Sequence, residues 1–172
     1  MGLLLIVFAH ACDILSTYLR TPDLSREVGP AYLLLVSKGF GGWGVLLGIK
    51  LVGVLLSVSL FVYYMRNRRY FYPPDEGMIF HDFLHYTHGK EALRGRDGRW
   101  LAPSPKLLAV WMAFTVAIGT AAYAYFLAWH NIMATPLLTR MADSLAPAAI
   151  FMVSAVVFWQ TLYHDYRRGG VR

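Results

Sequence analysis

The chain has one cysteine, few charged residues and none of the common catalytic motifs. With Cys12 alone, an internal disulfide and a cysteine-rich zinc site are excluded in this sequence. Charged residues make up only 15% of the 172 positions. The sequence contains no Walker loop, Rossmann glycine pattern, Gly-x-Ser-x-Gly elbow or His-Glu-x-x-His zinc motif. These absences favour a protein that is not an enzyme.

Apolar residues are abundant instead. Hydrophobic residues make up 57% of the chain and the mean hydropathy is +0.45, which is too apolar for an ordinary soluble domain of this length. In lipid every backbone amide needs a partner within the protein, so apolar runs of about 20 residues predict membrane-spanning helices. Such runs lie at about 1–19, 43–65, 106–129 and 146–166. The sequence therefore predicts an all-α integral membrane bundle of four transmembrane helices, with residues 1–172 as a single membrane domain.

The first apolar run also invites comparison with a lipoprotein signal peptide, because Cys12 follows the small residue Ala11. No basic segment precedes Leu3, and Ala9 occupies the position where such a signal has an aliphatic residue. We therefore interpret this run as a span, and Cys12 as a small buried apolar residue.

The distribution of Lys and Arg predicts the orientation of the chain. Most of these residues lie in the connection at about 66–105 and beside it, and in the C-terminal tail: Arg66, Arg68, Arg69, Lys90, Arg94, Arg96, Arg99, Lys106, Arg167, Arg168 and Arg172. We expect this connection and both termini to be cytoplasmic, in a prokaryotic inner membrane. Basic loops beside anionic lipid account for the net charge of +6 without a nucleic-acid partner.

Ionisable residues in or beside the spans mark a candidate functional site, because charge is costly in hydrocarbon. With a rise of about 1.5 Å per residue, Asp13 lies about 10 Å before the outer end of the first span, and Lys50 about 10 Å after the outer start of the second. Their matched depth predicts an ion pair. His10 and Thr17 share a helix face with Asp13, and with Glu27 they complete a predicted intramembrane polar cluster. These groups serve either a functional site or helix packing.

The segment between the first two spans predicts a short helix at about 30–38. Pro30 suits a helix start, and glycines from Gly39 to Gly42 suit its end. Because so few residues cannot cross the bilayer, we expect a re-entrant or interfacial helix on the outer side. Glu27, just before this helix, would favour the positive end of its dipole.

These residues resemble a family of small, uncharacterised prokaryotic multi-span membrane proteins, known as a domain of unknown function. The resemblance covers about residues 5–65. It includes Asp13 with Thr17, the run from Glu27 to Pro30 that is similar to a Glu-x-Asn-Pro motif, and Lys50. Gly29 stands where that family has Asn, so the side-chain amide is absent here. The resemblance implies a common membrane core and no established reaction.

Histidines gather in the cytoplasmic connection. On a helix His81, His85 and His88 lie on one face, a spacing that can present imidazoles to a zinc or iron ion. No second histidine cluster exists, so the ligand set is incomplete and we expect no cofactor. The preferred interpretation is a cytoplasmic amphipathic helix whose residues Ile79, Phe80 and Phe83 reach the acyl boundary.

Cations and aromatic rings follow the second span. Such residues are typical of the headgroup level of a membrane, and a lipid-headgroup site is the alternative. This predicted interfacial belt consists of Arg66, Arg68, Arg69, Tyr70 and Tyr72.

Three functions are open. The small size and the incomplete catalytic set favour a non-catalytic accessory or structural subunit of a larger membrane complex, with lipid and other subunits, or further copies, as partners. The second is a small transporter or channel-like protein built on Asp13, Lys50 and Glu27, since broken helices and charges within spans form transport pathways. The third is a membrane metalloenzyme using His81, His85 and His88.

Overall fold

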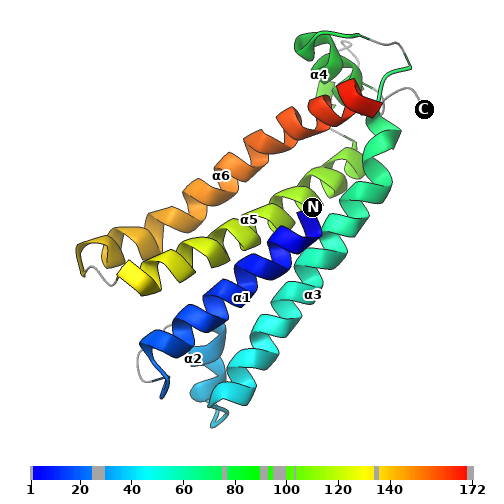
Figure 1. Ribbon diagram of the computed structural model, residues 1–172. Helices are drawn as coiled ribbons and strands as arrows, with labels where there is room; N and C mark the ends of the chain where they lie inside the picture. Colours follow the sequence, from blue (N-terminus) through cyan, green and yellow to red (C-terminus); the bar gives the residue numbers. More distant parts are fainter. Residues whose placement is uncertain are drawn as a thin grey trace. The chain divides into compact units, whose positions relative to one another are not determined.

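A computed structural model describes residues 2–24, 30–74, 77–89, 93–94, 100–102, 104–133 and 136–169 (Figure 1). The chain divides into two compact units. The first comprises Met1–Ser59 and Ala117–Ile150, and the second comprises Leu60–Val116 and Phe151–Arg172. The expectation of one domain over residues 1–172 stays a prediction.

Four helices are long and apolar enough to cross a membrane, as the sequence predicted. They are α1 (Gly2–Arg20), α3 (Trp43–Asn67), α5 (Pro105–Met133) and α6 (Pro136–Gly169). The largest difference from the prediction is at α6, which begins ten residues before the expected span. The residues added before the expected span include Thr139, Arg140 and Asp143, so by sequence these N-terminal turns are a more polar extension of the span.

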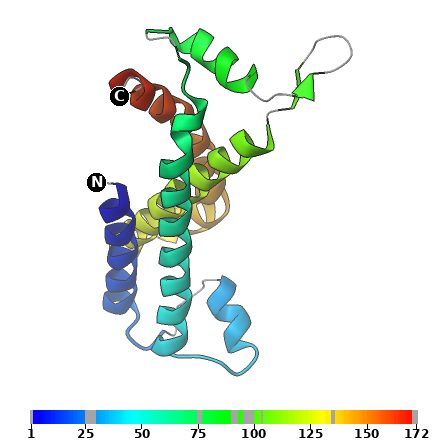
Figure 2. The ribbon, with the colours of Figure 1, turned by 90° about the vertical axis from the view of Figure 1, so that its right-hand side faces the viewer.

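The first unit contains the predicted short helix, α2 (Pro30–Val36). Left-handed backbone at Gly39 and Gly42 (φ +86° and +88°) turns the chain back toward α3, a conformation that glycine adopts readily. Tyr32 is buried with Leu24 and Leu46, and its hydroxyl accepts a hydrogen bond from the Gly42 amide (3.1 Å). Figures 1 and 2 both show α2 beside the first turns of α3.

The second unit has an aromatic core. The Tyr64 ring lies edge-on to Phe114 and Phe158, with centroids 4.8 and 6.1 Å away. After α3 come a short 3-10 helix, η1 (Arg68–Phe71), the helix α4 (Phe80–Gly89) and two short antiparallel strands, β1 (Leu93–Arg94) and β2 (Trp100–Ala102). The helical fold class is thus confirmed, with one two-stranded ribbon that the sequence analysis did not predict.

The expected environment of Phe83 is wrong. Instead of reaching lipid, this side chain is fully buried and packs against Tyr163 and Tyr166 of α6, with ring centroids 5.4 and 5.2 Å away. The Tyr163 hydroxyl also donates a hydrogen bond to the Met78 carbonyl (3.0 Å). The C-terminal turns of α6 therefore offer α4 an aromatic surface within the protein, while Ile79 remains 62% exposed.

Candidate functional site

The predicted pair of Asp13 and Lys50 is present in the first unit. The Lys50 ammonium of α3 donates to the Asp13 carboxylate of α1 and forms an ion pair with it. The Asp13 side chain is 3% exposed and that of Lys50 19%. Both helices are apolar on either side of the pair, so each charge stabilises the other in a place where water is scarce.

One turn further along α1, a second polar contact reaches α5. The side-chain amide of Asn131 donates to the hydroxyls of Ser16 (3.2 Å) and Thr17 (3.3 Å). Its carbonyl oxygen accepts a hydrogen bond from the Arg20 guanidinium (3.0 Å). The polar stripe of α1 thus contacts α3 through Asp13 and α5 through Ser16, Thr17 and Arg20.

His10 stands at the other end of the stripe. It is 7% exposed, and neither ring nitrogen has a hydrogen-bond partner within the part of the chain that the structure describes. A buried polar group without a partner is costly, so an imidazole in this position is a candidate for binding a water molecule.

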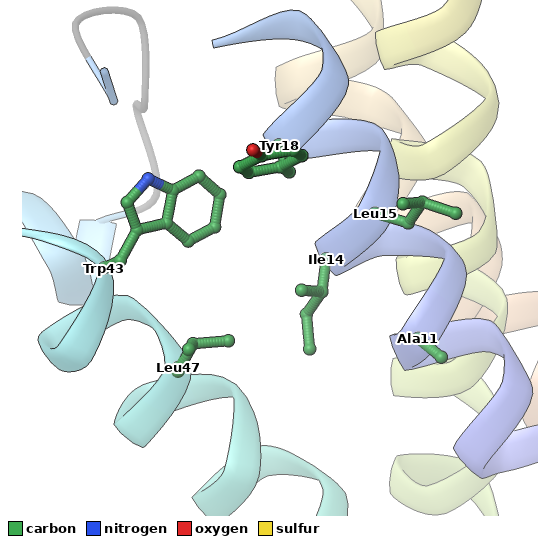
Figure 3. A pocket seen from close by; sticks show the side chains of 6 residues that line it. All are labelled: Ala11, Ile14, Leu15, Tyr18, Trp43 and Leu47. Atoms are coloured by element: carbon green, nitrogen blue, oxygen red, sulfur yellow. The ribbon is translucent and has the colours of Figure 1, made fainter. Parts of the chain in front are cut away.

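In addition to these polar contacts, α1 and α3 form a groove (Figure 3). The rings of Tyr18 and Trp43 lie edge to face in it, with centroids 5.5 Å apart. Its volume is about 490 Å³. The lining consists of Ala11, Ile14, Leu15, Tyr18, Trp43 and Leu47. Among the described residues no charged side chain lines it, so the Asp13–Lys50 pair is not part of this groove. Its walls fit an acyl chain or an apolar helix better than a polar solute.

The five members of the predicted polar cluster therefore have different surroundings. Asp13 and Lys50 contact each other, Thr17 contacts Asn131, and His10 is buried on the same helix. Glu27 lies outside the described residues.

The predicted interfacial belt is only partly directed toward the surroundings. Arg66 and Arg69 are exposed, but Arg68 pairs with the Asp165 carboxylate of α6, which also accepts from the Tyr64 hydroxyl at 3.4 Å. The Lys106 ammonium lies 3.2 Å from the centre of the Tyr70 ring, in a cation–π contact. Burial raises the pKa of Tyr72 to about 12, although the positive charge of Arg68 acts to lower it.

Of the three histidines on α4, two approach each other. The Nε2 atoms of His81 and His85 are 3.2 Å apart, and the His81 Nδ1–H donates to the Asp82 carboxylate (3.3 Å). His88 turns away, because its ring stacks on Trp159 (4.7 Å) and its Nδ1–H donates to the Leu84 carbonyl (2.8 Å). Over the described ranges, no group of three or more His, Cys, Asp or Glu side chains is placed to hold a metal.

Two residues that contact predicted site residues were not predicted from the sequence: Asn131, which bonds to Thr17, and Asp165, which pairs with Arg68. Asn131 carries no charge and lies near the end of α5, so neither the cost of a buried charge nor a matched depth pointed to it. Asp165 lies among basic residues at the end of α6, where a solvated carboxylate was the simpler expectation. The signal available for Asp165 was the presence of Arg68 at the corresponding end of another span, beside basic residues like those at the end of α6.

Comparison of the chain with models of known protein families, with curated proteins and with solved structures found no match. The resemblance noted for residues 5–65 stays a prediction.

Proposed function

We propose that this chain is a non-catalytic structural subunit of a larger membrane complex, with other membrane-protein chains or further copies of itself as partners. The observation that carries the proposal is the small share of α3 that the chain itself covers. In the most apolar stretch of this helix only 11% of the residues are buried, against 44% in α5. Membrane helices associate through close packing of their surfaces, so a helix that packs so little within its own chain is suited to a partner helix.

The exposed surface of α3 includes two glycines one turn apart. Gly44 and Gly48 share a helix face with the exposed Leu51 and Leu55. A Cβ atom added at either glycine would meet nothing within 4 Å. Small residues at this spacing allow two membrane helices to approach closely, and here that face is open.

The test is to replace the glycines of this face with larger residues and to measure the association of the chain with its partners. We expect Gly44→Leu with Gly48→Leu to dissociate the protein from its partners in mild detergent, because the leucines hold the helices apart. The matched control is Gly53→Leu, at a third open glycine of α3. It points about 180° away from Gly44 and should leave assembly unchanged. Co-purification measured by native mass spectrometry gives the result.

Because a Cβ atom added at either glycine meets nothing within 4 Å, we expect the double variant to keep its fold, which its circular dichroism spectrum checks. Equal association of the double variant and the Gly53 control would contradict the proposal.

A lone homo-oligomer that conducts ions in liposomes, and loses this conduction on Asp13→Asn, would instead favour the second candidate, transport. One observation favours that candidate, namely the buried His10, which lies near the Asp13–Lys50 pair and has no hydrogen-bond partner among the described residues. Within the described residues no comparable observation supports the metalloenzyme, since no three-ligand group is formed.

We further propose that both termini and the 66–105 connection are cytoplasmic in a prokaryotic inner membrane, and that α2 lies in or on the outer leaflet without crossing it. The excess of Lys and Arg in that connection and in the tail supports the orientation. The seven residues of α2 support the second part, because they extend only about 10 Å.

Labelling of single cysteines tests this topology. In a Cys12→Ala background, Ala31→Cys and Phe40→Cys should both react with an impermeant maleimide from the outer side. Phe40 serves as the labelling position after α2. Gly42 is less suitable, because its left-handed backbone would strain a cysteine. Both side chains are exposed in the structure. Reaction of the two positions from opposite sides would show that α2 spans the bilayer.

A further inference from the structure

We infer that His81 and His85 form a two-histidine site for a divalent transition-metal ion such as Zn²⁺ on the surface of α4. The site goes beyond the proposed structural function and does not depend on it. Two side chains on one helix supply the protein ligands, so the remaining coordination positions belong to water or to a donor on another molecule.

The distance between the two nitrogens fits a shared ion. Zn²⁺ binds imidazole nitrogen at about 2.0–2.1 Å, and two ligands of a tetrahedral ion at that distance are about 3.3 Å apart. The Nε2 atoms of His81 and His85 are 3.2 Å apart. Residues four apart lie one above the other on a helix, so α4 holds the two rings on the same face before any ion binds.

The proton positions also suit metal binding. Asp82 accepts a hydrogen bond from the Nδ1–H of His81 at 3.3 Å, so in the neutral ring the proton is on Nδ1 and the lone pair is on Nε2. Without an ion, the Nε2–H of His85 donates to this lone pair. With an ion, the His85 proton moves to Nδ1 and both lone pairs face the metal. A carboxylate behind a ligating histidine is a common arrangement in metal sites, where it fixes the ring and raises its basicity.

The site is open to the solvent. The side chains of His81 and Asp82 are 73% and 61% exposed, so an ion reaches them without any rearrangement of the protein. His88 lies on the same helix but is held by Trp159 and the Leu84 carbonyl. It therefore provides a matched control for the two proposed ligands.

The experiment is a Zn²⁺ titration of the full-length protein in mild detergent, purified without a histidine tag and stripped with a chelator. Competition with a chromophoric zinc indicator gives the affinity and the stoichiometry. We expect one ion per chain. His81→Gln and His85→Gln should each abolish binding at concentrations that saturate the unmodified protein, whereas His88→Gln should bind as the unmodified protein does.

Asp82→Asn adds a second measurement that does not remove a ligand. The amide holds the His81 ring less strongly, and we expect an affinity lower by about tenfold. Circular dichroism of each variant checks that the helix content is kept. The inference would be overturned by zinc binding that survives His81→Gln and His85→Gln, by equal losses in all three histidine variants, or by no binding to the unmodified protein.

Discussion

Replacing Asp13 with Asn, or Lys50 with Met, is expected to destabilise the first unit by about 3–5 kcal/mol in each case. Each single change leaves one ion buried without its counter-charge, since Asp13 is 3% and Lys50 19% exposed. The double change removes both charges and leaves a neutral Asn beside Met, so its cost should be smaller than that of either single change. The difference between the cost of the double change and the sum of the two single costs would then correspond to a coupling energy of several kcal/mol between the two residues.

Unfolding with a denaturing detergent, starting from mild detergent micelles, measures the four free energies of this cycle. Ser57→Ala is the matched control, because the Ser57 hydroxyl bonds to that of Thr120 at 2.8 Å in the same unit. A neutral hydrogen bond between membrane helices contributes only about 0.6 kcal/mol on average. If Asp13→Asn costs no more than Ser57→Ala, or if the double variant is the least stable of the set, the charges do not stabilise each other.

The Asp13–Lys50 pair was predictable because two physical rules act on it together. A charge in hydrocarbon requires a partner, and the fixed rise of an α-helix converts a residue number into a depth. Neither rule applies to Asn131, which is uncharged and whose contacts depend on how α5 is rotated. The four apolar helices were predictable for a similar reason, since their length is fixed by the thickness of the bilayer.

The surroundings of α4 were less accessible to sequence reasoning. Its pattern of apolar residues shows that one face avoids water, but the same pattern results whether that face meets lipid or protein. The burial of Phe83 within the protein depends on Tyr163 and Tyr166, which lie about 80 residues further along the chain. Helical spacing also placed three histidines on one face, whereas the Trp159 ring draws His88 away from the other two.

Phe83→Ala should detach α4 from α6. The side chain is fully buried between Tyr163 and Tyr166, so its removal leaves a cavity that costs about 3–5 kcal/mol. Most of this loss should be local, because α4 is a ten-residue helix whose Phe80, Phe83 and His88 rings pack on the end of α6. The amide protons of α4 should then exchange about a hundredfold faster or more, since each 1.4 kcal/mol corresponds to a factor of ten.

Hydrogen–deuterium exchange of α4 peptides, followed by mass spectrometry in the same detergent, measures this change, and Ile79→Ala is the control. Ile79 is also apolar and lies just before α4, but it is 62% exposed and should leave the exchange rates unchanged. A lipid-immersed α4 would give a different pattern: both changes would weaken its attachment to the micelle by similar amounts. Equal effects of Phe83→Ala and Ile79→Ala would therefore show that α4 is attached through lipid, and unequal effects that it is attached through the aromatic surface of α6.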